Sequence, residues 1–203
     1  MKKKQLVKAF ICMAAAVSVL TACQSKTQPG DTITAAEAGK EGDKESGSSE
    51  SQGVFESFTA QDLDGNQVDQ SIFSEADLTM INVWGTFCTP CLDEMPALGE
   101  LSKEYKDKGV QIVGVCSDTV KPDKELDQKT IDKAKEIVSQ TGADYLHIAM
   151  SGDLINSLRP QVMAVPMTIF VDSEGKQVGT AYMGARDKKS WAKIIDENLA
   201  SLQ

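Results

Sequence analysis

Two cysteines, Cys88 and Cys91, stand two residues apart at the point where an apolar run gives way to a helical pattern. The run over residues 78–84 is mostly apolar and predicts a buried strand. Residues 94–108 carry apolar side chains at helical spacing, and Gly109 follows them as a stop signal. Two intervening residues allow thiols in the first turn of a helix to close a disulfide. The spacing therefore predicts a strand, a short loop and a helix whose first turn holds the cysteine pair.

The predicted position of the pair suits thiol chemistry. At the N-terminus of a helix, backbone N–H groups and the helix dipole stabilise a thiolate, which is the species that attacks disulfides. Cys88 is therefore the expected nucleophile. Cys91 lies one turn inside the helix, where we expect it to be more buried and to resolve the mixed disulfide. Pro90 suits the first helical turn, because the N–H that proline lacks has no partner there.

The chain from residue 54 onward alternates strand and helix patterns. Residues 54–68 alternate in polarity around Asp64-Gly65-Asn66, a turn signal that predicts a hairpin. Further strands are expected at 110–116, 144–149, 167–171 and 177–183, and helices at 130–140, 154–158 and 187–202. This order predicts an α/β fold with a mixed central β-sheet flanked by helices on both faces.

Residues 1–23 have the three parts of an export signal. Four lysines precede an apolar run over residues 9–20, which is too short to span a bilayer comfortably. The run ends in Leu20-Thr21-Ala22-Cys23, which resembles the bacterial lipoprotein box. The resemblance implies that a signal peptide is removed, that Cys23 is lipidated, and that the protein is anchored at the extracytoplasmic face of the cell membrane. A plain secretory signal with an incidental cysteine is the alternative.

The segment after Cys23 has the composition of a linker. Residues 24–53 are rich in Gly, Ser, Glu, Lys, Asp and Thr and hold almost no large apolar side chain, so they cannot bury enough surface to offset the entropy of ordering. We expect a signal peptide over 1–22, lipidated Cys23 with a disordered linker over 23–53, and one domain over 54–203. The net charge of −9 disfavours nucleic acid as a partner.

Two motifs together resemble a known superfamily. Residues 84–91 read Trp-Gly-Thr-Phe-Cys-Thr-Pro-Cys, and Val165-Pro166-Met167-Thr168 stands before a later strand. In their setting of strands and helices, these motifs resemble those of the thioredoxin superfamily. Asn82 and Glu94 are similar to the residues at these places in its TlpA/ResA branch of anchored thiol–disulfide oxidoreductases. The resemblance covers about residues 54–203. It implies a redoxin or AhpC-TSA-like domain with a thioredoxin-like fold, an N-terminal β-hairpin extension and a helical insertion near 130–140.

The resemblance also implies a substrate-binding surface. Pro166 matches the family's cis-proline and is expected to face the disulfide, while the backbone of Val165 offers strand-like hydrogen bonds to a substrate peptide. An ordinary trans proline at a strand start is the alternative. Trp84 is expected to pack around the active site and is counted with the substrate-binding residues, and Phe87 offers an apolar contact for substrates.

Glu94 is the candidate for proton transfer. Asn82 stands where thioredoxin has a buried Asp, and an amide cannot titrate, so the role of proton acceptor would pass to Glu94, a carboxyl group near Cys91. A solvated acid favoured by the helix dipole is the alternative reading of Glu94. Cys116, in an apolar strand, is expected to be an inert core residue, with a redox partner as the alternative. His147 is expected to be structural.

The predicted function is an anchored extracytoplasmic thiol–disulfide oxidoreductase that reduces protein disulfides through Cys88 and Cys91. Its expected partners are protein thiols and disulfides, a membrane electron donor of the thiol type, and the membrane itself through the lipid anchor. We expect a monomer, with the redox-active disulfide in place of a cofactor and no metal.

Other classes of function remain open. A zinc site would need a second Cys or His pair, and only Cys116 and His147 remain for it. Haem attachment would need His where Leu92 stands. A lipoprotein binding module with a structural disulfide predicts a bond that is hard to reduce and no turnover. A thiol peroxidase would need a Pro-x-x-x-Thr-x-x-Cys loop, but Ile81 and Gly85 occupy the Pro and Thr positions before Cys88.

Overall fold

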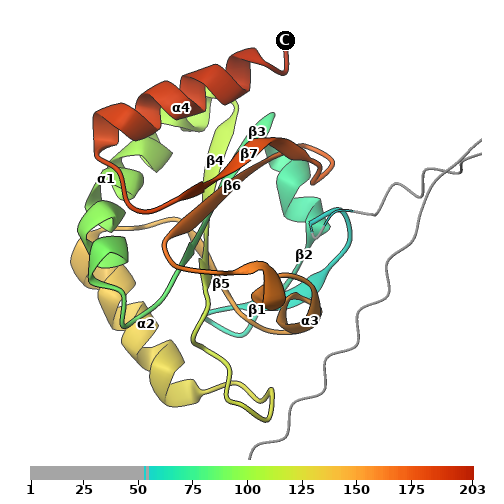
Figure 1. Ribbon diagram of the computed structural model, residues 1–203, viewed down its shortest axis with the longest axis vertical. Coiled ribbons are helices and arrows are strands. Elements are labelled where there is room, and N and C mark those ends of the chain that lie inside the picture. The colour runs from blue at the N-terminus through green and yellow to red at the C-terminus, as the bar shows by residue number, and fades with distance from the viewer. Residues whose placement is uncertain (1–52, 54) are drawn as a thin grey trace, which may run out of the picture. The chain divides into compact units, whose positions relative to one another are not determined.

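The computed structural model describes residue 53 and residues 55–203, so the expected signal peptide, the lipidation site Cys23 and the linker lie outside the described residues. Figure 1 shows a central sheet with helices on its two faces. The strands are β1 (Thr59–Asp62), β2 (Gln67–Asp69), β3 (Leu78–Trp84), β4 (Val110–Cys116), β5 (Leu146–Ala149), β6 (Met167–Asp172) and β7 (Gln177–Met183). The α-helices are α1 (Thr89–Tyr105), α2 (Gln128–Thr141), α3 (Leu154–Ser157) and α4 (Lys188–Ala200), and the 3-10 helices are η1 (Gln70–Glu75), η2 (Lys106–Lys108) and η3 (Arg159–Gln161).

The sheet has seven strands in the order β2-β1-β5-β4-β3-β6-β7. Strands β3, β4 and β5 are parallel to one another, and β1, β2, β6 and β7 pair antiparallel. The predicted mixed α/β sheet is confirmed. Strands β3 and β4 begin and end where the apolar runs do, because both are covered on two faces and every apolar residue finds a buried place.

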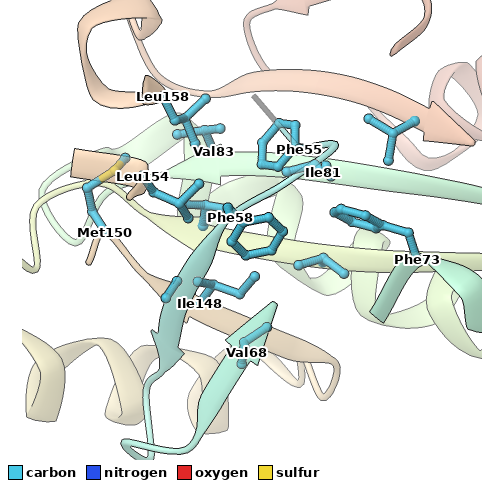
Figure 2. Packing of buried hydrophobic residues seen from close by; sticks show 14 of the residues in the cluster. Phe55, Phe58, Val68, Phe73, Ile81, Val83, Ile148, Met150, Leu154 and Leu158 are labelled. Atoms are coloured by element: carbon cyan, nitrogen blue, oxygen red, sulfur yellow. The ribbon is translucent and has the colours of Figure 1, made fainter. Parts of the chain in front are cut away.

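Three helices, α1, α2 and α4, cover one face of the sheet. Leu98 of α1 and Trp191 of α4 pack there against Met80 of β3, and Ile131 of α2 packs beside Trp84. The opposite face carries the aromatic rings of Phe55, Phe58 and Phe73, with ring centroids about 6 Å apart. Figure 2 shows these rings gathered near Ile81 with Leu154 and Leu158, from the region of α3, on the same side. Both faces of the central strands are therefore buried.

Helix α1 begins five residues before the helical spacing of apolar residues does. Its N-cap is Cys88, whose Sγ accepts a hydrogen bond from the backbone N–H of Cys91 at 3.2 Å, and Pro90 lies in the first turn. The first turn has no apolar periodicity, because its side chains serve the disulfide and the cap. This places the cysteine pair in the first turn of the helix, as predicted from its spacing.

The hairpin β1–β2 and the 3-10 helix η1 precede the parallel strands. Strand β1 pairs antiparallel with β5, so the hairpin extends the sheet at one side. Helix η1 has no helical apolar pattern in the sequence and was not predicted; it buries only Phe73. Strand β5 begins at Leu146, two residues later than expected. No helix of the described residues is both long enough and apolar enough to cross a membrane.

Candidate active site

The cysteines at the start of α1 are joined. Cys88 and Cys91 form a disulfide, with their Cα atoms 5.3 Å apart. Cys88 is the N-cap residue and Cys91 the third residue of the helix, so the N-terminal end of the helix dipole acts on Cys88. In the reduced protein, the same N–H groups would stabilise negative charge on the Cys88 sulfur.

The two sulfurs differ in access. Cys88 retains 6% of its surface and Cys91 none. Sγ of Cys88 also lies 3.6 Å from the backbone oxygen of Val165, across 77 residues of sequence. The Val165–Pro166 peptide bond is cis, as the resemblance implied. The structure thus brings Cys88 and the segment before β6 together at the one sulfur that a partner can approach.

Two exposed apolar side chains lie in the segments around Cys88 and Val165. Phe87 is 68% exposed and Met163 is 87% exposed, and both line a hollow of about 630 Å³ that Val165 also borders. Phe87, for which an apolar contact with substrates was expected, is thus exposed to solvent. Trp84 is fully buried. Its side chain packs beneath the disulfide, in place of the substrate contact with which it was grouped from the sequence.

The loop before Cys88 is fixed by hydrogen bonds. Asp118 accepts one from the backbone N–H of Thr86 at 3.0 Å and one from its hydroxyl at 2.7 Å. From α2, Nζ of Lys133 donates to the backbone oxygen of Thr86 at 3.0 Å. The segment after β4 and helix α2 therefore set the position of the residues that lead into the disulfide.

Glu94 is a buried residue of α1, with 3% of its surface exposed. One carboxylate oxygen accepts from Nδ2 of Asn82 at 3.0 Å. The other accepts from Nε1 of Trp191 at 3.0 Å and from the backbone N–H of Arg186 at 3.1 Å. A carboxyl group with this burial and these partners is not the solvated helix-start acid of the alternative reading.

Opposing effects act on the protonation of Glu94. Burial raises the pKa of its carboxyl group above the ordinary value, and this is the larger effect. The hydrogen bonds from Trp191, Arg186 and Asn82, and the charge of Arg186, lower the pKa but do not cancel the effect of burial. Glu94 lies one helical turn after Cys91, so a carboxyl group with a raised pKa is on the same side of the helix as the buried sulfur.

Cys116 is a free, fully buried cysteine of β4. Its Sγ lies 3.4 Å from a carboxylate oxygen of Asp118. Burial first, and then the negative charge of Asp118, raise the pKa of the Cys116 thiol far above its usual range, so the reactive thiolate is suppressed. Among residues 53 and 55–203, no three His, Cys, Asp or Glu side chains are grouped so that they could hold a metal ion.

His147 of β5 is buried, as a structural histidine would be. Its Nε2 lies 3.0 Å from the backbone oxygen of Ala143. Burial lowers the pKa of His147 from 6.5 to about 4, which outweighs the effect of that hydrogen bond. The imidazole is therefore neutral at neutral pH.

This lowered pKa predicts a loss of stability in acid. The unfolded chain takes up the His147 proton near pH 6.5 and the folded chain only near pH 4, so stability falls as the pH drops through this window. The difference amounts to about 3 kcal/mol of unfolding free energy. Between pH 7 and pH 4, we expect the unfolding free energy of His147→Phe to fall by about 3 kcal/mol less than that of the wild type. Urea unfolding at both pH values measures this difference. An equal loss in the two proteins would contradict the prediction.

Two partners of Glu94, and one of Asn82, were not predicted from the sequence. Trp191 reaches Glu94 from the last helix, and Arg186 donates through its backbone N–H, which the residue type does not reveal. Thr168 meets Asn82 at 3.2 Å only because β6 pairs with β3. Their separations in sequence from the residues they contact, 97, 92 and 86 residues, place them beyond any local pattern.

Comparisons with known proteins agree with this geometry. The model of the AhpC/TSA family matches residues 53–189, which is more than half of the chain. The thiol-disulfide oxidoreductase ResA of Bacillus thuringiensis subsp. konkukian is 30% identical over 122 residues, covering 60% of this chain and 63% of ResA. The thiol:disulfide interchange protein DsbE of Vibrio cholerae is 30% identical over 140 residues, covering 68% of this chain and 67% of DsbE. The match thus spans less than two thirds of the length of the ResA relative.

A solved structure supports the fold. The thiol:disulfide interchange protein of the thioredoxin family from Chlorobium tepidum superposes with a TM-score of 0.57 at 21% identity, covering 70% of this chain and 93% of that one. At this identity the likeness concerns the fold, which is thioredoxin-like. Because the family model covers most of the described chain, including the disulfide and the cis-proline, the protein belongs to the AhpC/TSA family.

Proposed function

We propose that this protein is a thiol–disulfide oxidoreductase that reduces protein disulfides at the extracytoplasmic face of a bacterial membrane. The observation that carries the proposal is the unequal access of the two sulfurs, because Cys88 retains 6% of its surface and Cys91 none. A substrate sulfur then meets only Cys88, and Cys91 is left to resolve the product. The names of the ResA and DsbE relatives support this class of reaction.

The proposed reaction transfers two electrons to the substrate. The Cys88 thiolate attacks a substrate disulfide, a mixed disulfide forms through Cys88, and one substrate sulfur leaves as a thiolate. The Cys91 thiolate then attacks Sγ of Cys88, which closes the enzyme disulfide and releases the second substrate sulfur. The two thiol protons of the enzyme balance the two substrate thiols. A thiol-type electron donor at the membrane would return the enzyme to the dithiol.

The surface near Cys88 suits a polypeptide substrate. The backbone of Val165, 3.6 Å from Sγ of Cys88, would pair with an extended peptide. The adjoining hollow of about 630 Å³, bordered by Phe87 and Met163, would take an apolar side chain near the substrate disulfide. Trp84 supports this surface from below.

Glu94 would accept the proton of Cys91. Cys91 is buried away from water, so its thiol needs a proton acceptor within the protein before it can attack. A carboxyl group whose pKa is raised by burial binds that proton more readily than an exposed one. The hydrogen bonds from Asn82 and Trp191 hold the carboxylate in place.

Reduction of insulin by dithiothreitol tests the proposed activity. The protein is expected to accelerate the precipitation of the insulin B chain over dithiothreitol alone, because the Cys88–Cys91 pair cycles between dithiol and disulfide. A binding module with a structural disulfide predicts no acceleration, and that result would sink the proposed function.

Glu94→Gln is expected to change the pH dependence of alkylation of the reduced protein by iodoacetamide. Removing a negative charge near the two thiols favours their thiolates, so the midpoint should move down by about one pH unit. Asp93→Asn is the matched control, because Asp93 is exposed on the same helical turn and its loss should leave the profile unaltered. Profiles of Glu94→Gln and wild type that coincide would remove Glu94 from the mechanism.

Cys23→Ala is expected to move the protein from the membrane fraction to the soluble extracytoplasmic fraction. In this proposal, the lipid attached to Cys23 supplies the affinity for the membrane. Immunoblots of the two fractions from cells measure the change, and labelling with a palmitate analogue should be lost in the same variant. Unchanged membrane retention of an unlabelled Cys23→Ala protein would contradict a lipid anchor.

A further inference from the structure

A polar row crosses the sheet on the face that α1 covers. In the register of the strands, Thr168 of β6 pairs with Asn82 of β3, Asn82 with Gly114 of β4, and Gly114 with His147 of β5. Glu94 of α1 meets this row through Asn82. The row therefore runs from the proposed proton acceptor to a histidine for which the proposed function has no use.

Gly114 makes room for His147. A Cβ atom on Gly114 would lie 2.2 Å from Nδ1 of His147, so the imidazole occupies the place of a side chain over β4. Because the backbone oxygen of Ala143 can only accept a hydrogen bond, Nε2 carries the proton of the neutral ring. Nδ1 is thus an unprotonated acceptor that lies above Gly114, the residue between His147 and Asn82 in the strand register.

Four buried polar atoms have no hydrogen-bond partner in the described part of the chain. They are Asn82 Oδ1, Trp84 Nε1, Tyr145 Oη and His147 Nδ1. Three of these side chains are in contact, because the His147 ring stacks on Tyr145 with centroids 4.4 Å apart and meets Trp84 edge to face at 5.6 Å. Asn82 lies on the same face of β3 as Trp84, and the strand register places it two strands from His147, across Gly114.

The chemistry of these four atoms is complementary. The indole of Trp84 only donates, the hydroxyl of Tyr145 donates or accepts, and the free atoms of Asn82 and His147 accept. A water molecule offers two hydrogens and two lone pairs, which match this set. Buried polar groups that lack protein partners are commonly satisfied by internal water, and leaving them unpaired costs about 1–3 kcal/mol each.

We infer that an internal water molecule lies beside the His147 ring, bounded by Trp84, Tyr145, His147 and Asn82, and that through it His147 holds the Asn82 amide with its NH2 group toward Glu94. Water there accepts from the Trp84 N–H and donates to Nδ1 of His147 and Oδ1 of Asn82. His147 is then a positioning residue that acts on Glu94 through Asn82. The link to catalysis rests on the proposed function; the water site does not.

The orientation of the Asn82 amide decides what Glu94 meets. With NH2 toward Glu94, the carboxylate gains a donor, whereas a flipped amide would present an oxygen to it. The other titratable or charged groups around Glu94 are Cys91 on its own helix, Arg186 before α4, and Tyr145, whose hydroxyl has its pKa raised by burial and by the Glu94 charge. None of these changes when the amide turns, so the effect of His147 is separable from theirs.

NMR of the full chain tests the inference in two ways. In the wild type, the Trp84 indole N–H is expected to show a cross-relaxation peak with long-lived internal water. In His147→Phe, which keeps a stacked ring without the acceptor, that peak should be lost. The midpoint of the Glu94 carboxyl ¹³C titration, followed in the oxidised protein, should rise by about one pH unit, because the freed amide no longer donates to the carboxylate.

Ile148→Val is the matched control. Ile148 is the next residue of β5, but its side chain packs on the opposite face, so the variant loosens the same strand and should leave both signals in place. Absence of the water peak in the wild type, or a Glu94 midpoint that His147→Phe leaves where it was, would overturn the inference. Neither readout needs turnover. Insulin reduction without the water peak would defeat the water site alone, and the water peak without insulin reduction would defeat the proposed function alone.

Discussion

Replacement of Cys88 by serine is expected to abolish the reduction of insulin, with a loss of at least about 10³-fold in rate. A serine hydroxyl is not ionised at neutral pH and cannot form a disulfide, so the first step of the proposed reaction has no substitute. Cys91 cannot take over, because it has no exposed surface. The rate is measured from precipitation of the insulin B chain, with dithiothreitol alone as the baseline.

Cys116→Ala is the matched control for this loss. Cys116 is the third cysteine of the described domain, but it is buried and its thiol pKa is strongly raised by burial. We expect the variant to retain nearly all of the wild-type rate. Full insulin reduction by Cys88→Ser would refute the assignment of the nucleophile, and a Cys116→Ala protein that folds normally without activity would bring back the redox role of Cys116.

The second large effect is expected from Cys91→Ser, which should trap substrates. Cys88 still attacks a disulfide, but no thiol remains at position 91 to release the product, so the mixed disulfide accumulates. Non-reducing gels of cell extracts should show covalent adducts that disappear with reductant. Mass spectrometry of the adducts then identifies the natural substrate.

The double variant Cys88→Ser/Cys91→Ser controls for adducts that form elsewhere. It carries the same change at position 91 but lacks the attacking sulfur, so it should form no adduct. Adducts of equal amount in the single and double variants would show that trapping does not pass through Cys88. Cys91→Ser with no adduct under conditions where the wild type turns over would contradict the resolving role of Cys91.

The properties of the site depend on how the N-terminal part of α1 is buried. The N-cap of α1 leaves Cys88 with 6% of its surface exposed, and the first two turns hold Cys91 and Glu94 against the sheet. The same burial that hides Cys91 from substrates raises the pKa of Glu94. Access and proton transfer are therefore two consequences of how α1 packs on β3.

Local patterns in the sequence were enough for the core elements and the reacting atoms. Strands β3 and β4 have the predicted bounds, because a strand buried on two faces is a continuous apolar run in sequence. The spacing of Cys88 and Cys91 led to the disulfide, whereas the cis peptide bond before Pro166 was implied by the resemblance to the thioredoxin superfamily and not by a local pattern. Helix η1, which buries a single side chain, leaves too weak a pattern to predict.

The environment of the reacting atoms was decided only by the tertiary structure. Glu94 could be suspected from the sequence, but its bonds to Trp191 and to the backbone of Arg186 join residues 97 and 92 positions apart. The meeting of Asn82, Gly114 and His147 follows from the register of three parallel strands. Residue type and spacing determine which element forms and which atoms can react. Burial and hydrogen bonding arise where distant segments pack, and they decide how those atoms hold protons.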